Sequence, residues 1–285
     1  MLVQLYIKIL KMSSYKIIIS GGGTGGHIYP AIAIARKIQE LNKNAEILFV
    51  GAKGRMEMEK VPEEGFNIVG LNVVGIQRSL SINAILKNLK FPFLLIKSFN
   101  HAKKIIEDFK PNIVVGVGGY ASGPTLRMAH RLKIPTLIQE QNSYAGLTNK
   151  WLSKKTQKIC VAYENMSQFF EVNKLVLTGN PVRKDIENLE TKLSEAKKYF
   201  KVSKNEKVIL VLGGSLGAKS INEGIINSIH TIKDQDIKLI WQVGKRYFEA
   251  FKNNKNIINP FFKKDRESSW HLFVIKVENR DILIE

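Results

Sequence analysis

The sequence predicts an α/β fold made of two doubly wound, Rossmann-like domains that face one another across a cleft. Short apolar runs that end in glycine alternate with amphipathic stretches, a pattern typical of βαβ units and a parallel sheet. The sequence of strand, glycine loop and helix occurs twice, starting near Lys16 and again near Lys207. A chain of 285 residues is long enough for two domains of ordinary size.

In the first half, apolar runs predict the strands of one sheet. The run Lys16–Ser20 leads into the glycine loop Gly21–Gly26. We expect a helix to begin near Pro30, because proline suits the first helical turn. Further strands are expected at residues 46–50, 112–116, 135–139, 158–162 and 175–178.

The second half repeats the arrangement. A helix is expected over 192–200, a strand over 207–212, a glycine loop over 213–217 and another strand over 237–241. The turn residues Gly179-Asn-Pro181 mark the boundary. The predicted domains are therefore residues 15–178 and residues 179–285.

The composition limits the compartment and the class of partner. The net charge of +19 favours polyanions such as nucleic acid, anionic lipid or phosphorylated substrates, and a general compositional bias would also produce it. The single cysteine, Cys160, rules out a disulfide within the chain and fits a reducing cytosol. No apolar stretch reaches the length of a transmembrane helix. The first residues make a poor signal peptide, and Met12 is an alternative start.

The loop Gly21–Gly26 has the features of an anion site. Its glycines allow a ligand to approach the backbone, and the next helix directs unpaired N–H groups toward an anion. A tight turn without a ligand is the alternative interpretation. The spacing matches neither the dinucleotide G-x-G-x-x-G motif nor a Walker A loop, which weakens the case for NAD and ATP.

Polar residues follow several of the predicted strands. His27 closes the first loop at the edge where open α/β sheets bind ligands, and histidine is readily tuned to accept a proton. Gly116–Pro124 and Gln139–Asn142 follow two later strands of the same half. Gly213–Gly217 forms a second candidate phosphate cradle, to which Arg183 could add a cation.

Five of these segments occur in the order seen in the MurG family, which the chain resembles over residues 15–245. MurG enzymes are UDP-N-acetylglucosamine:undecaprenyl-pyrophosphoryl-muramyl-pentapeptide N-acetylglucosaminyltransferases. Five motifs in register are far more specific than any one of them. They are Gly21–His27 with Pro30, Gly118–Pro124, Gln139–Asn142, Gly179–Arg183 and Gly213–Ala218.

The resemblance implies a GT-B fold and an inverting transfer of N-acetylglucosamine (GlcNAc) from UDP-GlcNAc. The acceptor would be the muramyl C4 hydroxyl of lipid I, the product lipid II of peptidoglycan synthesis, and no metal or other cofactor would be needed. By match, His27 is the general base. The matching donor-site residues are Thr24, Gly25, Gly26, Asn142, Arg183 and Ser215.

The resemblance also implies peripheral docking on the cytoplasmic face of the membrane. The segment Ile82–Lys104 supplies apolar residues beside lysines, a combination typical of interfacial segments that bind an anionic membrane surface. An ordinary core helix with a solvated face is the alternative interpretation.

After about Pro260 the sequence departs from the family pattern. Family members are longer, and the segments that hold the donor ribose and sugar are not recognisable here. We therefore expect an incomplete second domain, with exposed sheet edges, of the kind that a frameshift or a premature stop produces. The chain would then be a shortened transferase or an inactive remnant.

Two other functions fit part of the sequence. One is a GT-B transferase that uses a nucleotide sugar but glycosylates a different glycolipid. The other is a nucleic-acid or membrane binder driven by charge. We expect no nucleic-acid partner, because the sequence lacks the interleaved aromatic and basic residues of single-strand binders.

Overall fold

The computed structural model describes residues 15–73, 91–182, 189–203, 205–214, 217–233, 237–244, 247–248 and 273–275. Contacts divide the chain into two compact units, Met1–Glu187 and Asn188–Glu285. The predicted domain boundary, after Thr178, stays a prediction.

The N-terminal unit contains a seven-stranded sheet in the order β3-β2-β1-β4-β5-β6-β7. All neighbouring strands are parallel, as the alternation of strands and helices predicted. The strands are β1 (Tyr15–Ser20), β2 (Ala45–Ala52), β3 (Asn67–Leu71), β4 (Ile113–Gly116), β5 (Thr136–Glu140), β6 (Lys158–Val161) and β7 (Leu175–Leu177).

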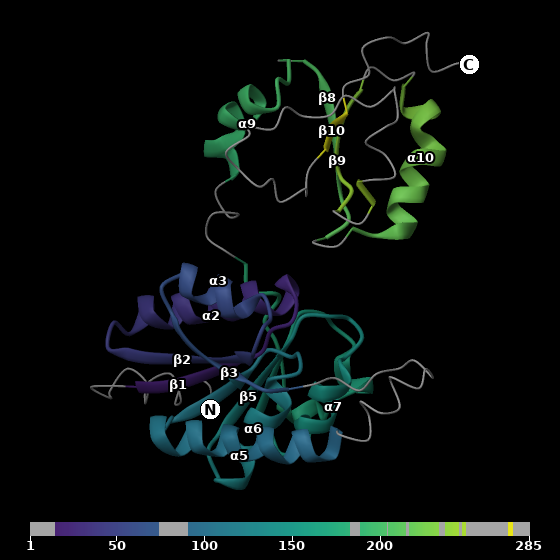
Figure 1. Cartoon of the computed structure of the whole chain (residues 1–285). Coiled ribbons are helices and arrows are strands. Elements are labelled where there is room, and N and C mark those ends of the chain that lie inside the picture. Colours follow the sequence, from purple (N-terminus) through teal and green to yellow (C-terminus); the bar gives the residue numbers. More distant parts are fainter. Residues whose placement is uncertain are drawn as a thin grey trace. The chain divides into compact units, whose positions relative to one another are not determined.

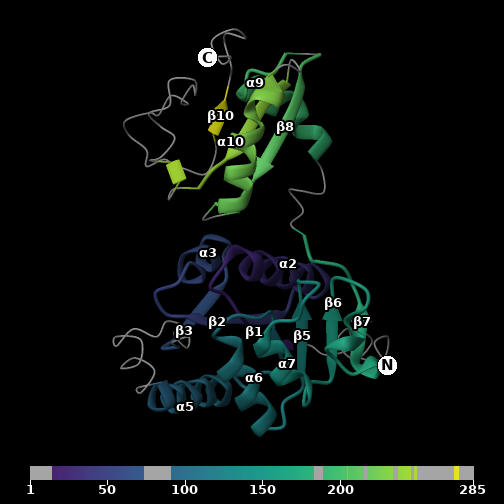
Figure 2. The same ribbon diagram turned by 90° about the vertical axis from the view of Figure 1, so that its right-hand side faces the viewer.

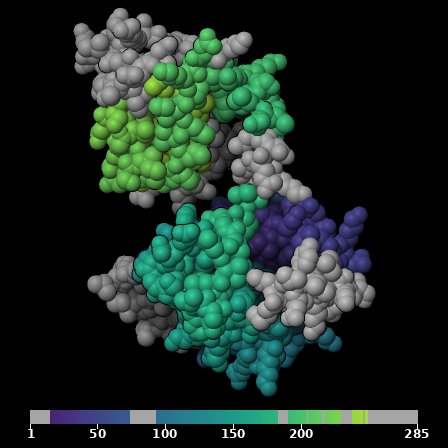
Figure 3. Space-filling model, turned by 180° about the vertical axis from the view of Figure 1, so that it is seen from behind, coloured from purple at the N-terminus to yellow at the C-terminus, as the bar shows by residue number. Residues whose placement is uncertain are grey.

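Helices cover both faces of this sheet (Figures 1 and 2). On one face lie α2 (Gly25–Leu41) and α3 (Glu57–Glu63). On the other lie α5 (Phe91–Phe109), α6 (Ser122–Arg131) and α7 (Leu147–Ser153). Two short 3₁₀ turns, η1 (Met166–Gln168) and η2 (Val172–Lys174), precede β7. Figure 3 shows the molecule from behind, where the teal residues, which belong to the C-terminal half of this unit, form a continuous surface.

Strand β1 shows why two helical layers form. Successive side chains of a strand point to opposite faces. Ile18 is fully buried in the hydrophobic cluster that includes residues of α5, α6 and α7. Its neighbours Ile17 and Ile19 are buried in a second cluster with residues of α2 and α3. A strand that is apolar on both faces needs a helical layer on each.

The first helix begins earlier than predicted. Helix α2 starts at Gly25, and Pro30 lies inside it rather than at its first position. The backbone N–H groups of His27 and Ile28 both donate to the Thr24 carbonyl, which sets the first turn. His27 therefore belongs to the first helical turn rather than to the loop before it.

The C-terminal unit is smaller and contains a three-stranded sheet in the order β10-β9-β8. Strands β8 and β9 are parallel, and β10 pairs with β9 in the antiparallel direction. The fully buried Trp241 lies at the centre, and its indole N–H donates to Asn222 Oδ1 at 3.1 Å. The elements are η3 (Leu189–Lys192), α9 (Leu193–Tyr199), β8 (Lys207–Leu212), α10 (Lys219–Lys233), β9 (Ile237–Gln242) and β10 (Phe273–Ile275).

The predicted fold class is confirmed. The N-terminal unit is a doubly wound parallel α/β sheet, and the C-terminal unit repeats the order of strand, glycine loop and helix between β8 and α10. Strand β8 carries large exposed apolar side chains, among them Leu210 and Leu212.

His130 of α6 predicts a pH dependence of stability. Its Nε2 lies 2.9 Å from Thr136 Oγ1 on β5. Burial, followed by the positive charges of Arg127, Lys155 and Lys174, lowers the pKa of His130 to about 4 from its usual 6.5. Between these values the unfolded chain binds the proton and the folded chain does not. The free energy of unfolding therefore falls as the pH falls through this window.

We expect His130→Asn to remove this part of the pH dependence. From pH 6.5 to 4.5 the wild type should lose roughly 1–2 kcal/mol more stability than the variant, because the ring is only half-buried and solvent screens its charge. Urea unfolding at several pH values measures the difference. Equal losses in both proteins would contradict the assignment, and the exposed His101→Asn variant serves as control.

Candidate active site

The candidate site lies at the point where the strand order of the N-terminal sheet reverses. From β1 the chain continues to β2 and β3 on one side, whereas β4 to β7 extend the sheet on the other. In open α/β sheets, ligands bind at the carboxyl ends of the strands that flank such a switch point. The segments that leave β1 and β4 here are Gly21–His27 and Val117–Tyr120.

These two segments pack directly on each other. The Gly22 N–H donates to the Gly118 carbonyl at 3.3 Å. Gly119 has a φ of +88°, and a Cβ there would lie 2.3 Å from the Gly22 carbonyl oxygen. Only glycine fits such a contact at positive φ. The second glycine motif therefore acts as a support for the first.

A buried carboxylate that we did not predict holds the first loop. Glu57 of α3 accepts hydrogen bonds from the backbone N–H groups of Gly23 at 2.8 Å and of Ala52 at 2.9 Å. Its side chain is 1% exposed. A buried charge needs such partners, so Glu57 fixes the loop to the end of β2.

The imidazole of His27 lies between the two loops. Thr24 Oγ1 is 3.2 Å from its Nδ1. On the other side, Nε2 lies so close to Gly118 that a Cβ there would be only 2.9 Å away. Burial lowers the pKa of His27 below its usual 6.5, and the Glu140 carboxylate opposes this shift only in part. At neutral pH the ring is therefore uncharged and able to accept a proton.

Glu140, the last residue of β5, organises the neighbouring polar groups. Its Oε1 accepts from the backbone and side-chain N–H groups of Asn142, both at 3.0 Å. Its Oε2 accepts from the Gly146 N–H at 3.0 Å and from Asn149 Nδ2 at 2.9 Å. All four are hydrogen bonds to a carboxylate that is 1% exposed. The two amide side chains are thereby held in fixed orientations.

The segment Gly179-Asn-Pro181 also joins this edge of the sheet. Gln139 Nε2 donates to Asn180 Oδ1 at 3.2 Å, and Asn180 Nδ2 donates to the Gln141 carbonyl at 3.1 Å. Gln141 Nε2 donates in turn to Gln139 Oε1. Two motifs that are separate in the sequence thus form one hydrogen-bonded network.

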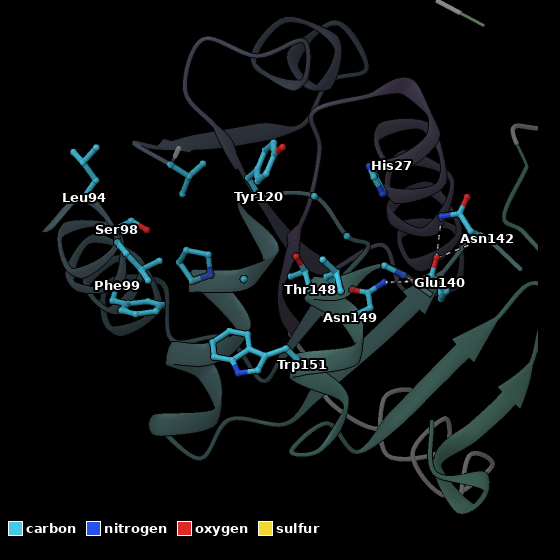
Figure 4. Close-up of a pocket in the computed structure, with 18 residues that line it drawn as sticks. His27, Leu94, Ser98, Phe99, Tyr120, Glu140, Asn142, Thr148, Asn149 and Trp151 are labelled. Carbon is cyan, nitrogen blue, oxygen red and sulfur yellow. Dashed lines mark hydrogen bonds between the residues drawn. The ribbon is translucent and has the colours of Figure 1, made fainter. Parts of the chain in front are cut away.

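A cavity of about 890 Å³ opens beside His27. His27, Glu140 and Asn142 lie on one side of it, and Leu94, Ser98 and Phe99 of α5 lie on the opposite side (Figure 4). The other described lining residues come from α5, the segment after β3, the second glycine motif and the start of α6, and α7 with the residue before it: Leu95, Val73, Gly118, Gly119, Tyr120, Gly123, Pro124, Gly146, Leu147, Thr148, Asn149 and Trp151.

The structure brings part of the predicted site together. His27 and Asn142 line the same cavity. Thr24, Gly25 and Gly26 lie at the start of α2, one turn or less from His27. Arg183 and Ser215 lie outside the described residues. The roles of all seven residues stay predictions. Their setting also depends on Glu140, which belongs to the predicted segment Gln139–Asn142, and on Glu57 and Asn149, which were not predicted.

In the second unit, Gly213, Gly214 and Gly217 separate β8 from α10. Gly214 and Gly217 both have a φ of +75°. A Cβ on Gly217 would lie 2.0 Å from the Val243 carbonyl oxygen, so glycine is required for packing there.

Comparison with known proteins identifies the family. Residues 17–161 match the glycosyltransferase family 28 N-terminal domain. Over 241 residues the chain is 54% identical to the UDP-N-acetylglucosamine–N-acetylmuramyl-(pentapeptide) pyrophosphoryl-undecaprenol N-acetylglucosamine transferase of Flavobacterium psychrophilum, which aligns with 85% of this chain. The enzyme of the same name from Bacteroides fragilis is 48% identical over 263 residues, which are 90% of this chain and 68% of that protein.

A solved structure gives the same result. The crystal structure of Acinetobacter baumannii MurG superposes with a TM-score of 0.60 at 27% identity, over 84% of this chain and 63% of that one. The chain spans 65% of the length of the Flavobacterium relative, less than two thirds. By sequence and by fold, it belongs to the MurG family within glycosyltransferase family 28.

Proposed function

We propose that the protein transfers N-acetylglucosamine from UDP-GlcNAc to the C4 hydroxyl of the muramyl sugar of lipid I. The observation that carries this proposal is the uncharged imidazole of His27, which lines a large cavity at the switch point of the sheet. The names of the curated relatives support the donor and the acceptor.

In the proposed reaction, His27 removes the proton of the C4 hydroxyl as the oxygen attacks the anomeric carbon of GlcNAc. The bond from that carbon to the UDP oxygen breaks, the configuration inverts and UDP leaves. Helix N-termini stabilise negative charge. Thr24, Gly25 and Gly26, at the start of α2, and Ser215 are proposed donor-site residues. Asn142 and Arg183 complete the proposed donor site.

The test measures transfer of labelled GlcNAc from UDP-GlcNAc to a lipid I analogue. It uses this chain and a second form extended at its C-terminus to the length of the Flavobacterium relative. Turnover by either form supports the proposal, and the comparison shows whether the added segment is needed. A folded extended form that binds UDP-GlcNAc but glycosylates a different glycolipid would favour another GT-B transferase. Absence of turnover in both forms would overturn the proposal.

We also propose that α5 docks on an anionic membrane surface at its cytoplasmic face. Phe93 is 62% exposed and Ile96 is 57% exposed, and Lys97 Nζ lies 4.5 Å from the centre of the Phe93 ring. Apolar side chains flanked by lysine suit the headgroup boundary. Leu94 and Leu95 line the cavity instead, and residues 82–90 of the predicted segment lie outside the described residues. None of the helices in the described part of the chain is long and apolar enough to cross a membrane.

We expect the double variant F93S/I96S to bind anionic vesicles roughly tenfold more weakly, because two exposed apolar side chains no longer enter the interface. Sedimentation with phosphatidylglycerol vesicles measures the binding, and neutral vesicles separate the contribution of charge. Val172→Ser, at a residue exposed to 72% on another surface, is the control. If F93S/I96S bound anionic vesicles as tightly as the wild type and the control do, α5 would not be the docking helix.

A further inference from the structure

The cavity beside His27 has two chemically different sides. Polar groups gather around His27, Glu140 and Asn149, whereas α5 contributes Leu94, Leu95 and Phe99 (Figure 4). Within this apolar side lies one hydroxyl group, that of Ser98.

Ser98 is 2% exposed, and its Oγ has no hydrogen-bond partner among the described residues. A buried hydroxyl without a partner costs free energy, and such groups are rare in folded proteins. Ser98 lines the cavity, so a bound ligand can supply the missing partner. Asn149 Oδ1, on the polar side of the same cavity, is likewise buried and unpartnered.

The lining favours an uncharged group at Ser98. No lysine or arginine occurs among the described residues that line the cavity. A pyrophosphate placed against Leu94, Leu95 and Phe99 would lose its hydration without gaining a counter-charge. An amide flanked by small apolar groups suits this surface, because the hydroxyl can pair with it while the apolar groups pack.

The chemistry of the proposed acceptor supplies such a group. On a muramyl sugar, C3 carries a lactyl ether whose carboxyl forms an amide with the peptide. C3 is bonded to C4, whose hydroxyl would react at His27, whereas the pyrophosphate is attached at C1 across the ring. The lactyl arm therefore starts beside the reacting atom and has to extend into the surrounding cavity. At about 890 Å³ the cavity is large enough for a ligand of this size.

We infer that Ser98 is a specificity-determining residue that hydrogen-bonds the first amide of the acceptor's lactyl–peptide arm. The apolar side chains of α5 pack against the lactyl methyl group next to that amide. This inference rests on the proposed function, since it takes the muramyl sugar as the acceptor. Through this hydrogen bond Ser98 recognises the lactyl–peptide arm, the substituent that distinguishes a muramyl sugar from plain N-acetylglucosamine.

The experiment measures binding of two water-soluble acceptor analogues to the full chain by calorimetry. Both carry N-acetylglucosamine joined through pyrophosphate to a ten-carbon lipid, and only one carries the lactyl–dipeptide arm at C3. We expect Ser98→Ala to weaken binding of the analogue with the arm about fivefold, the loss of one hydrogen bond. Binding of the analogue without the arm should not change. Ser98→Thr keeps the hydroxyl and should keep the affinity.

Ser153→Ala is the matched control. Ser153 is also a buried serine, but its hydroxyl donates to the Lys150 carbonyl at 2.8 Å and does not line the cavity. We expect this variant to bind both analogues normally and to unfold at lower urea concentration. Ser98→Ala removes an unpartnered group, so its unfolding midpoint should stay the same or rise.

Each outcome decides between the possibilities. If Ser98→Ala weakened both analogues equally, Ser98 would contact the sugar, the pyrophosphate or the lipid, and the inference would be wrong. If it weakened neither, the hydroxyl would have no role in acceptor binding. If the wild type bound neither analogue, the proposed function itself would fail, and the inference with it.

Discussion

Replacing His27 by alanine is expected to lower the rate of GlcNAc transfer by roughly 10²–10⁴-fold, the usual contribution of a positioned general base. The affinity for UDP-GlcNAc should change little, because the proposed role of His27 is to remove the proton of the acceptor hydroxyl and not to hold the donor. Single-turnover transfer measures the rate, and calorimetry with UDP-GlcNAc measures the affinity. The form of the chain that turns over is used for both.

The pH profile makes this test specific for proton transfer. Burial lowers the pKa of His27 below 6.5, so the ring becomes protonated, and inactive as a base, only at a pH below that value. We expect the acid limb of the wild-type profile to have a midpoint below 6.5 and to disappear in His27→Ala. His101→Ala changes an exposed histidine of α5 and is the control. An equal loss of rate and of donor affinity would recast His27 as a binding or structural residue.

The parallel sheet was predictable because its evidence is local. Runs such as Lys16–Ser20 and Lys207–Leu212 consist largely of consecutive apolar residues, a pattern typical of parallel strands, and each ends at glycines that leave room for a turn. The start of α2 was predicted too late. Proline favours the first turn of a helix, so the start was expected near Pro30. In the structure the Thr24 carbonyl accepts the N–H groups of His27 and Ile28, and the helix begins at Gly25.

The support of the site was not predictable in the same way. Glu57 lies in the sequence Arg55-Met-Glu-Met-Glu-Lys60, which resembles any exposed, charged helix. It is buried because two glycines make room for its carboxyl group. A Cβ on Gly22 would lie 2.3 Å from Glu57 Oε1, and one on Gly51 would lie 2.6 Å from its Cγ. Such complementarity depends on contacts between distant segments, which periodicity does not reveal.

The same reason explains Asn149 and Ser98. Both lie on helices that mix polar and apolar residues, a pattern that in sequence is typical of an ordinary amphipathic helix. Their importance comes from the cavity that α5 and α7 form with the loops after β1 and β4. The residues at the strand ends were therefore predictable, whereas those that complete the cavity were not.

Glu140→Gln is expected to damage both stability and activity, although it changes the shape of the side chain very little. The carboxylate accepts four hydrogen bonds, two on each oxygen. An amide keeps only one acceptor oxygen, and its NH₂ group would face two N–H donors. Each donor that is left buried without a partner costs about 1–3 kcal/mol. Asn149 is buried whereas Asn142 and Gly146 are exposed, so we expect the free energy of unfolding to fall by about 1–3 kcal/mol, measured by urea denaturation.

Glu140→Gln is expected to lower the transfer rate for two reasons. The Glu140 charge raises the pKa of His27 against the effect of burial. Removing that charge lowers the pKa further and makes the imidazole a weaker base. Asn142 and Asn149 also lose their fixed orientation at the cavity. We expect the transfer rate to fall roughly 10²-fold, and the His27 ring resonances, followed by NMR, to titrate at lower pH than in the wild type.

Glu164→Gln provides the matched control, because Glu164 is an exposed carboxylate in the loop after β6. It should leave stability, rate and the His27 titration unchanged. A rise in the His27 pKa in Glu140→Gln would contradict the electrostatic role of Glu140. Loss of stability without a change in that pKa would leave Glu140 only as the group that fixes the loop from Asn142 to Asn149. Glu140 therefore contributes both to the geometry of the site and to the basicity of its imidazole, and the two contributions are separately measurable.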